Sequence, residues 1–180
     1  MHIGTKVSGA LQWVWSTFEH VDNAPTQGEP ATKAHYNYYD PSCTDCVVNE
    51  PPAQPWNPAV PTTPSHIERV IPIDDNAKSL NTSYQNALAN LVAGSVWVNY
   101  ELVSTQWPTA SPDTQCVSSD FQCTDPTGNP APSFLANTTL ETYIQGSVPQ
   151  TSSSCIHCHN NSATTNGKFS DFTYLLQRAQ

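Results

Sequence analysis

Proline is the residue type that most limits how this chain can fold. The chain has 16 prolines among its 180 residues, well above the usual share of roughly 5%. Between residues 23 and 72 they recur without helical spacing, and proline interrupts both helices and sheet interiors. The same stretch holds three tyrosines, Tyr36, Tyr38 and Tyr39. Their aromatic content argues against simple disorder, so we expect an ordered loop held by contacts and a disulfide.

Regular elements are expected beyond this loop. Apolar residues recur at helical spacing from Leu80 to Val92, and Gly94 follows where a helix C-cap belongs, so a helix is predicted over about residues 77–93. Residues 95–107 alternate between two faces and are rich in β-branched and aromatic side chains, which predicts a strand.

Two further helices are expected near the C-terminus. Thr138 and Glu141 have the spacing of a capping box, and a short apolar stripe after them predicts a helix that ends near Gly146. A second apolar stripe, which begins at Phe169, predicts a C-terminal helix. Near the N-terminus, large apolar residues crowd between residues 13 and 18, so this segment is expected to be buried.

The expected fold is therefore α+β, irregular and loop-rich, with a few short helices and a small β element, stapled by disulfides. We expect residues 1–180 to form a single domain. The alternative is two small lobes, a loop- and β-rich one over residues 1–135 and a helical one over residues 136–180.

A C-x-x-C-H sequence, Cys155-Ile156-His157-Cys158-His159, lies near the end of the chain. In a secreted protein this spacing indicates covalent attachment of a c-type haem. Cys155 and Cys158 would each form a thioether with the haem, and His159 would bind the iron as an axial ligand. The alternatives are a disulfide between the two thiols or half of a zinc site. Zinc needs four ligands, and the other C-x-x-C pair lies too far along the chain for a zinc ribbon.

Four cysteines remain, which is an even number and suggests two disulfides in an oxidising compartment. The local pairing joins Cys43 to Cys46 and Cys116 to Cys123, although four cysteines allow three connectivities. A redox-active role for Cys43 and Cys46 is the alternative, but no βαβ pattern surrounds them as in a thioredoxin-like site.

The sixth coordination position decides what such a haem does, because a protein ligand there favours electron transfer and an open position favours small-molecule binding. Met1 is the only methionine, and its place at the chain end makes it a poor ligand. His2 and His20 lie on either side of the aromatic segment and are the leading distal candidates. The other histidines are His35, His66 and His157.

Charge and hydropathy limit the partners. The chain has 6 basic and 15 acidic residues, for a net charge of −9, so nucleic acid is not an expected partner. A redox partner with a basic docking face would be attracted. No apolar run is long enough to span a membrane, and the first twenty residues lack the pattern of a signal peptide.

These residues carry a resemblance to a known family. Residues 155–159 resemble the haem-binding motif of c-type cytochromes, and residues 13–23 with 169–179 resemble the C-terminal portion of long bacterial cytochrome c family proteins. The resemblance implies that Met1 is not the start of the precursor and that the chain is a mature or truncated piece. Small soluble cytochromes c carry the motif near the N-terminus, so their compact all-α fold is not expected here.

The expected function is electron transfer by a periplasmic or extracellular cytochrome with one covalent haem c, ligated by two histidines. The first alternative is a haem enzyme or small-molecule binder with an open distal site. The second is a subunit of an electron-conducting extracellular assembly formed by copies of the chain. No carboxylate pair, serine triad or phosphate-binding loop stands out.

Overall fold

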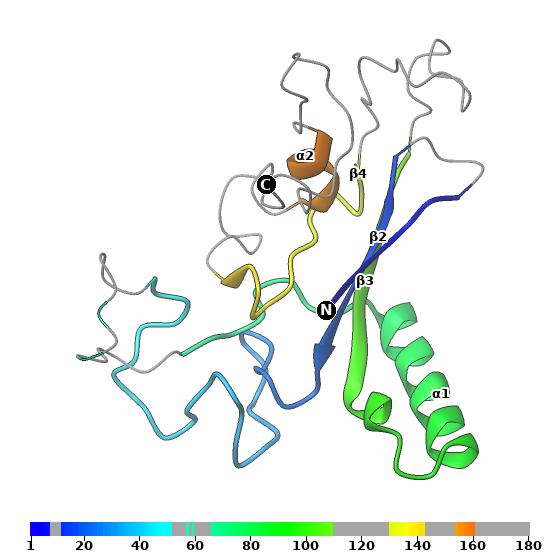
Figure 1. Ribbon diagram of the computed structural model, residues 1–180. Coiled ribbons are helices and arrows are strands. Elements are labelled where there is room, and N and C mark those ends of the chain that lie inside the picture. The colour runs from blue at the N-terminus through cyan, green and yellow to red at the C-terminus, as the bar shows by residue number, and fades with distance from the viewer. Residues whose placement is uncertain are drawn as a thin grey trace.

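The computed structural model describes residues 1–7, 12–51, 57, 59, 66–109, 130–142 and 154–160. Its elements in chain order are β1 (His2–Thr5), β2 (Val14–His20), α1 (Asp75–Leu91), the short 3₁₀ helix η1 (Val96–Asn99), β3 (Tyr100–Pro108), β4 (Pro130–Ala131) and α2 (Cys155–Asn160). Figure 1 shows one long twisted sheet with α1 beside its lower half and α2 beside its upper half.

The four strands form an antiparallel sheet in the order β1-β2-β3-β4. β2 and β3 are its centre, and their register shifts between Thr17 and Phe18. Burial alternates along β2, with Trp15, Thr17 and Glu19 buried and the residues between them half-buried. Since successive strand residues point to opposite faces, one face of the sheet is covered far more fully than the other.

The covered face holds polar residues that are anchored by hydrogen bonds. Arg69 from the loop before α1 donates to Glu19 and to Glu101, with both Nη2–O distances at 3.0 Å. Glu19 also accepts a hydrogen bond from the backbone of Thr138. Three segments that are distant in sequence are therefore joined at one buried carboxylate.

α1 packs beside the edge of β3 through polar contacts. Asn81 donates to the carbonyl of Leu102 at 2.9 Å and accepts from its N–H at 2.7 Å, and Gln85 donates to the carbonyl of Tyr100 at 3.0 Å. These side-chain amides form hydrogen bonds with backbone groups of β3 that a further strand would otherwise pair with. The helix begins after Asp74, whose carboxylate caps the N–H of Asn76.

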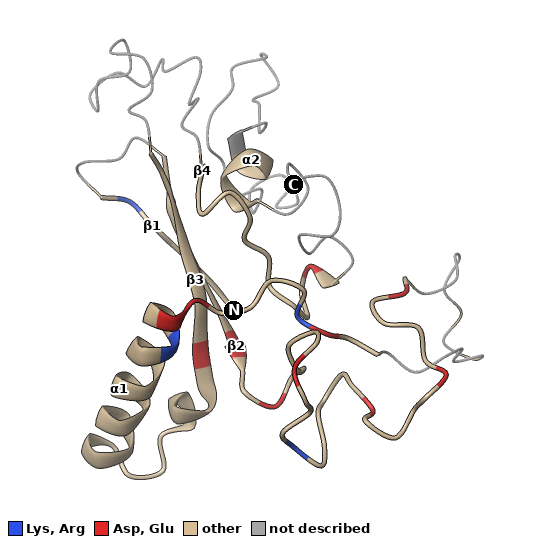
Figure 2. Ribbon diagram, turned by 180° about the vertical axis from the view of Figure 1, so that it is seen from behind, with Lys and Arg blue, Asp and Glu red and all other residues tan. Residues whose placement is uncertain are grey.

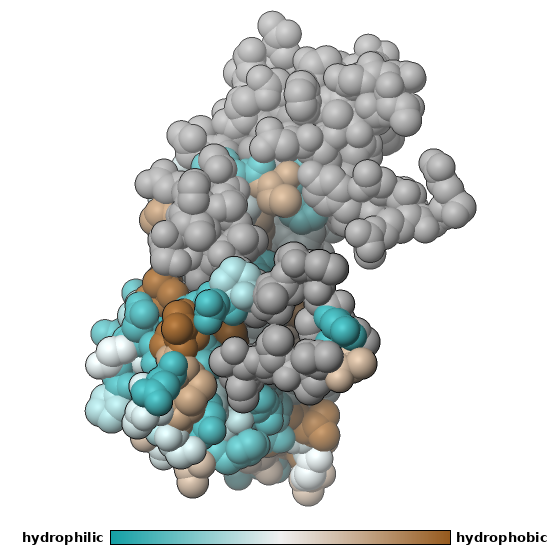
Figure 3. All heavy atoms as spheres, turned by 90° about the vertical axis from the view of Figure 1, so that its left-hand side faces the viewer, coloured by the Kyte–Doolittle hydropathy of each residue, from teal (hydrophilic) through white to brown (hydrophobic). Residues whose placement is uncertain are grey.

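The long loop between β2 and α1 is ordered where it is described, as its aromatic content predicted. Tyr39 stacks on His66 with ring centroids 4.0 Å apart, and Tyr36 meets Tyr39 edge-on. The disulfide predicted between Cys43 and Cys46 is present. In Figure 3, the described residues on the side of the molecule with this loop are mostly hydrophilic, with apolar residues in small groups.

The structure confirms the mixed, loop-rich, disulfide-stapled fold that is not a compact all-α one. The predicted helix over 77–93 is α1, shifted by two residues. The predicted strand over 95–107 is correct only from Tyr100, because residues 96–99 form η1. The pairing of Cys116 with Cys123 and the C-terminal helix lie outside the described residues.

No helix in the described ranges is both long enough and apolar enough to cross a membrane.

The capping residue is Asn137, one position before the Thr138 that the sequence predicted. The Asn137 side chain accepts from the N–H groups of Thr139 and Leu140, and Glu141 accepts from the N–H of Asn137. Asn137 is therefore the capping residue of a turn over residues 138–141. The remainder of the helix expected up to Gly146 lies outside the described residues.

Candidate haem-attachment site

The C-x-x-C-H sequence forms α2, a single short helix. Residues three apart lie on neighbouring positions of a helix face, so Cys155 and Cys158 are on the same side of α2. Neither cysteine forms a disulfide, and Cys158 is exposed whereas Cys155 is partly buried. Cys155 packs against the small core cluster of Ile73, Val103 and Leu135.

α2 is fixed to the sheet by one apolar and one polar anchor. Ile156, between the two cysteines, is fully buried. Gln106 of β3, which is also fully buried, accepts from the N–H of Ile156 at 2.9 Å and donates to Ser154 at 3.1 Å and to the Pro132 carbonyl at 2.8 Å. The motif is thus held against the upper half of β3.

The imidazole of His159 stacks on the indole of Trp15. Their ring centroids are 4.2 Å apart and their planes differ by 20°. The Trp15 Nε1–H is buried and has no hydrogen-bond acceptor among the described residues, although a buried indole N–H usually has one. This N–H group, beside the motif, is available to donate a hydrogen bond to a polar group of a bound ligand.

His2 lies on the same sheet face as Trp15. Gly4 is opposite Trp15 and His2 is opposite Thr17, so His2 is about 7 Å further along β1 from Gly4. Its Nε2 is 2.7 Å from Glu141 Oε1. The structure therefore brings His2 to the same face of the sheet as the motif, with one ring nitrogen in contact with a carboxylate.

His20 lies at the opposite end of β2, five residues and roughly 16 Å from Trp15. Its ring contacts Tyr100 edge-on, and its Nδ1 accepts a hydrogen bond from the N–H of Asp22 at 3.1 Å. A neutral ring that accepts at Nδ1 carries its proton on Nε2. The structure does not bring His20 and His159 together.

Burial raises the pKa of the Cys155 thiol from its ordinary 9.0 to about 12, and the nearby Glu141 carboxylate adds to the rise. This thiol is therefore protonated at neutral pH. Within the described part of the chain, no group of three or more His, Cys, Asp or Glu side chains is arranged to hold a metal ion.

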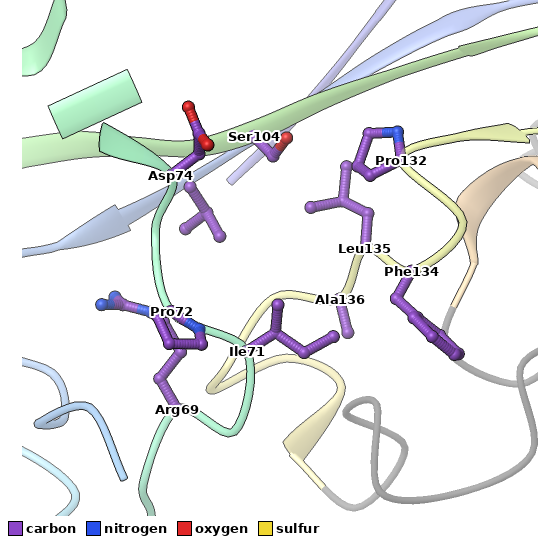
Figure 4. Close-up of a pocket in the computed structure, with 10 residues that line it drawn as sticks. Arg69, Ile71, Pro72, Asp74, Ser104, Pro132, Phe134, Leu135 and Ala136 are labelled. Carbon is purple, nitrogen blue, oxygen red and sulfur yellow. The ribbon is translucent and has the colours of Figure 1, made fainter. Parts of the chain in front are cut away.

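A small pocket of about 150 Å³ is lined in part by Val103 and Leu135 of the core cluster that Cys155 contacts. Figure 4 shows Asp74 and Ser104 at one side of it, Ile71 and Ala136 at the opposite side, and Leu135 beside Pro132 between them. Pockets for drug-sized ligands have volumes of roughly 300–1,000 Å³. This pocket is too small for a porphyrin.

The residues of the motif fit a covalently attached haem. Two thiols outside disulfide bonds share one side of α2, an imidazole follows them, and an unpaired indole N–H is adjacent. Sequence reasoning predicted Cys155, Cys158 and His159 as haem-binding residues and did not include Trp15 or Glu141 in the site. The only signal for Trp15 was the alternating Trp13-Val14-Trp15 sequence, which places both indoles on one strand face.

Comparisons of the chain with protein-family models, with curated proteins and with solved structures give no match.

Proposed function

We propose that this protein is an exported cytochrome that carries one haem, bound covalently by Cys155 and Cys158 with His159 as an axial iron ligand, and that it transfers electrons. The observation that carries the proposal is the C-x-x-C-H sequence on one docked helix with both thiols outside disulfide bonds. When bound, such a haem supplies an iron that gains and loses one electron.

The second axial ligand in this proposal is a histidine, and the strand register supports His2 over His20. His2 shares a sheet face with Trp15, the residue that stacks on His159. With Nε2 in contact with Glu141, the other ring nitrogen of His2 is the one available for a metal. A carboxylate partner on a ligating imidazole is a common arrangement that fixes the ring.

Export is supported by the Cys43–Cys46 disulfide, because such bonds persist in oxidising compartments. The proposed partner is a redox protein with a basic docking face, because the chain has a net charge of −9.

The test is the mass and spectrum of the protein after expression with haem-attachment machinery. We expect one haem per chain by intact mass, a thioether haemochrome spectrum, and low-spin iron. The variant His2→Ala should lose the low-spin signature, while His20→Ala should keep it. A chain whose two thiols are unmodified or joined to each other would rule out the proposal.

A haem with an open distal position is the second candidate, because the structure does not bring His20 near His159 and leaves His2 as the one distal candidate of the two. If the free ring nitrogen of His2 does not bind the iron, the distal side accepts an external ligand. Addition of cyanide or carbon monoxide distinguishes the two candidates. Rapid binding by the wild-type protein indicates the open site, and slow or absent binding indicates the electron carrier.

A further inference from the structure

The stack between Trp15 and His159 is the closest aromatic contact of the motif among the described residues. A centroid distance of 4.2 Å with planes 20° apart means that the two rings lie nearly parallel and overlap. One face of the imidazole is therefore covered by the indole, and the ring plane of His159 follows the plane of Trp15.

Trp15 is itself held in place by the sheet. It lies inside β2, is 8% exposed, and has the second indole, Trp13, at a centroid distance of 6.3 Å. Gly4 of β1 is opposite it. A Cβ atom at Gly4 would lie 3.3 Å from the Trp15 ring and 3.4 Å from the Trp13 ring, so β1 runs closely over both indoles.

The backbone of His159 is held independently of this stack. The buried Ile156 side chain and the Gln106 hydrogen bonds fix α2 to β3. β3 pairs directly with β2, with Gln106 opposite Trp15. The indole and the helix that carries the imidazole are thus anchored to neighbouring residues of one sheet.

We propose that Trp15 is a positioning residue for His159, whose imidazole plane it sets before any haem is attached. This inference rests on the proposed function, in which His159 is an iron ligand. The stack reduces the ring orientations that His159 would have to give up when it binds iron, which is the benefit of a pre-organised ligand. Trp15→Phe keeps a ring at this position, and Trp15→Leu removes it.

The experiment uses the full chain in two states, with isotope-labelled histidine and tryptophan. In the chain produced without haem attachment, the His159 ring signals should be shifted upfield by the indole and should show contacts to the Trp15 ring. Trp15→Leu should lose this shift, and Trp15→Phe should restore part of it. In the haem-loaded protein, Trp15→Leu should change the electron paramagnetic resonance g-values and the reduction potential, which respond to the orientation of the axial imidazole.

Trp97→Leu is the matched control, because Trp97 is 52% exposed and packs on Tyr100. It should leave the His159 signals and the haem spectrum unchanged. A folded Trp15→Leu variant with wild-type His159 signals and wild-type g-values would overturn the inference. If Trp15→Leu does not fold, Gly4→Ala replaces it as the test, because the added Cβ would lie 3.3 Å from the Trp15 ring. Displaced nuclear magnetic resonance signals from both Trp15 and His159 would support the positioning role. Displaced Trp15 signals with unchanged His159 signals would overturn it. A wild-type chain that shows the stack but never acquires haem would refute the proposed function and not the stack.

Discussion

At the scale of single residues, the most consequential group is a buried ion cluster that no sequence pattern indicated. The Glu19 side chain is fully buried, that of Arg69 is 8% exposed and that of Glu101 is 24% exposed. Burial of charges is favourable only when they are paired and hydrogen-bonded. The cluster meets most of this condition, because Arg69 Nη2 bridges both carboxylates and Glu19 also accepts from the Thr138 N–H. The buried Nε–H of Arg69 has no acceptor among the described residues.

We expect Glu19→Gln to lower the free energy of unfolding by about 3 kcal/mol, because it leaves the buried Arg69 charge with one carboxylate in place of two. Urea denaturation followed by circular dichroism measures the change. Lys78→Gln is the control, since it removes the Lys78–Asp75 pair, which is exposed and 3.8 Å apart, and should have no measurable effect. Equal losses in the two variants would contradict a special role for burial.

The two motif cysteines should react differently in the chain without haem. Cys158 is exposed, whereas burial raises the pKa of Cys155 to about 12, so iodoacetamide at pH 8 should modify Cys158 and spare Cys155. Because the folded state holds the Cys155 proton more tightly than the unfolded chain, its contribution to stability is complete below pH 9 and is lost as the pH rises toward 12. Relative to Cys155→Ala, the wild type should lose up to about 1.4 kcal/mol per pH unit in that interval. Equal labelling of both thiols, read by peptide mass, would disprove the predicted burial of Cys155.

At the scale of elements, the sequence predicted what periodic apolar side chains specify. α1 was predicted because Leu80, Tyr84 and Leu88 repeat at helical spacing, and β3 because its side chains alternate. β2 was not predicted as a strand, because its buried positions include Thr17 and Glu19. These residues look like surface residues until their partners, Asn137 and Arg69, are placed opposite them.

The candidate site is likewise divided into features that the local sequence predicts and contacts that only the fold creates. The haem-attachment prediction for Cys155, Cys158 and His159 rests on five consecutive residues, and it stays a prediction. The neighbours of these residues come from β1, β2 and the turn over 138–141, which are 14 to 157 positions away in the sequence. No local pattern encodes such contacts. His2 was named because it precedes the aromatic segment, whereas its contact with Glu141 depends on the register of β1.

The docking of α2 on the sheet should depend on Gln106. We expect Gln106→Leu to leave the N–H of Ile156 without its acceptor, at a cost of about 1–3 kcal/mol. Hydrogen exchange of the Ile156 amide should then be at least about tenfold faster. Gln85→Leu is the matched control, since Gln85 bonds the Tyr100 carbonyl from α1. That variant should speed amide hydrogen exchange in α1 and leave exchange in α2 unchanged. Faster α2 exchange in both variants would show that α2 depends on the whole sheet and not on Gln106.

At the scale of the whole molecule, most of the described acidic residues lie away from the motif, and Glu141 beside Cys155 is the exception. Figure 2 shows the described acidic residues mainly on the loops around the lower half of the sheet, while α2 is free of Lys, Arg, Asp and Glu. The net charge of −9 nevertheless acts over the whole molecule at low ionic strength, where the Debye length is about 30 Å at 0.01 M salt and about 10 Å at 0.1 M. A haem on α2 would therefore be reached by the field of the acidic lower half in dilute salt, whereas Glu141 lies beside the motif at any salt concentration.

The net charge of −9 predicts a salt dependence for electron exchange by the haem-loaded protein. The rate with a cationic reagent, hexaammineruthenium, should fall about tenfold between 0.01 and 0.2 M salt, because salt screens the attraction that concentrates the cation at the protein. The rate with anionic hexacyanoferrate should rise over the same range, and an uncharged quinone should serve as the control with no slope. Stopped-flow absorbance measures all three rates. If both ions gave the same slope, the acidic surface would have no part in the approach of partners, and a basic docking face on the redox partner would no longer be expected.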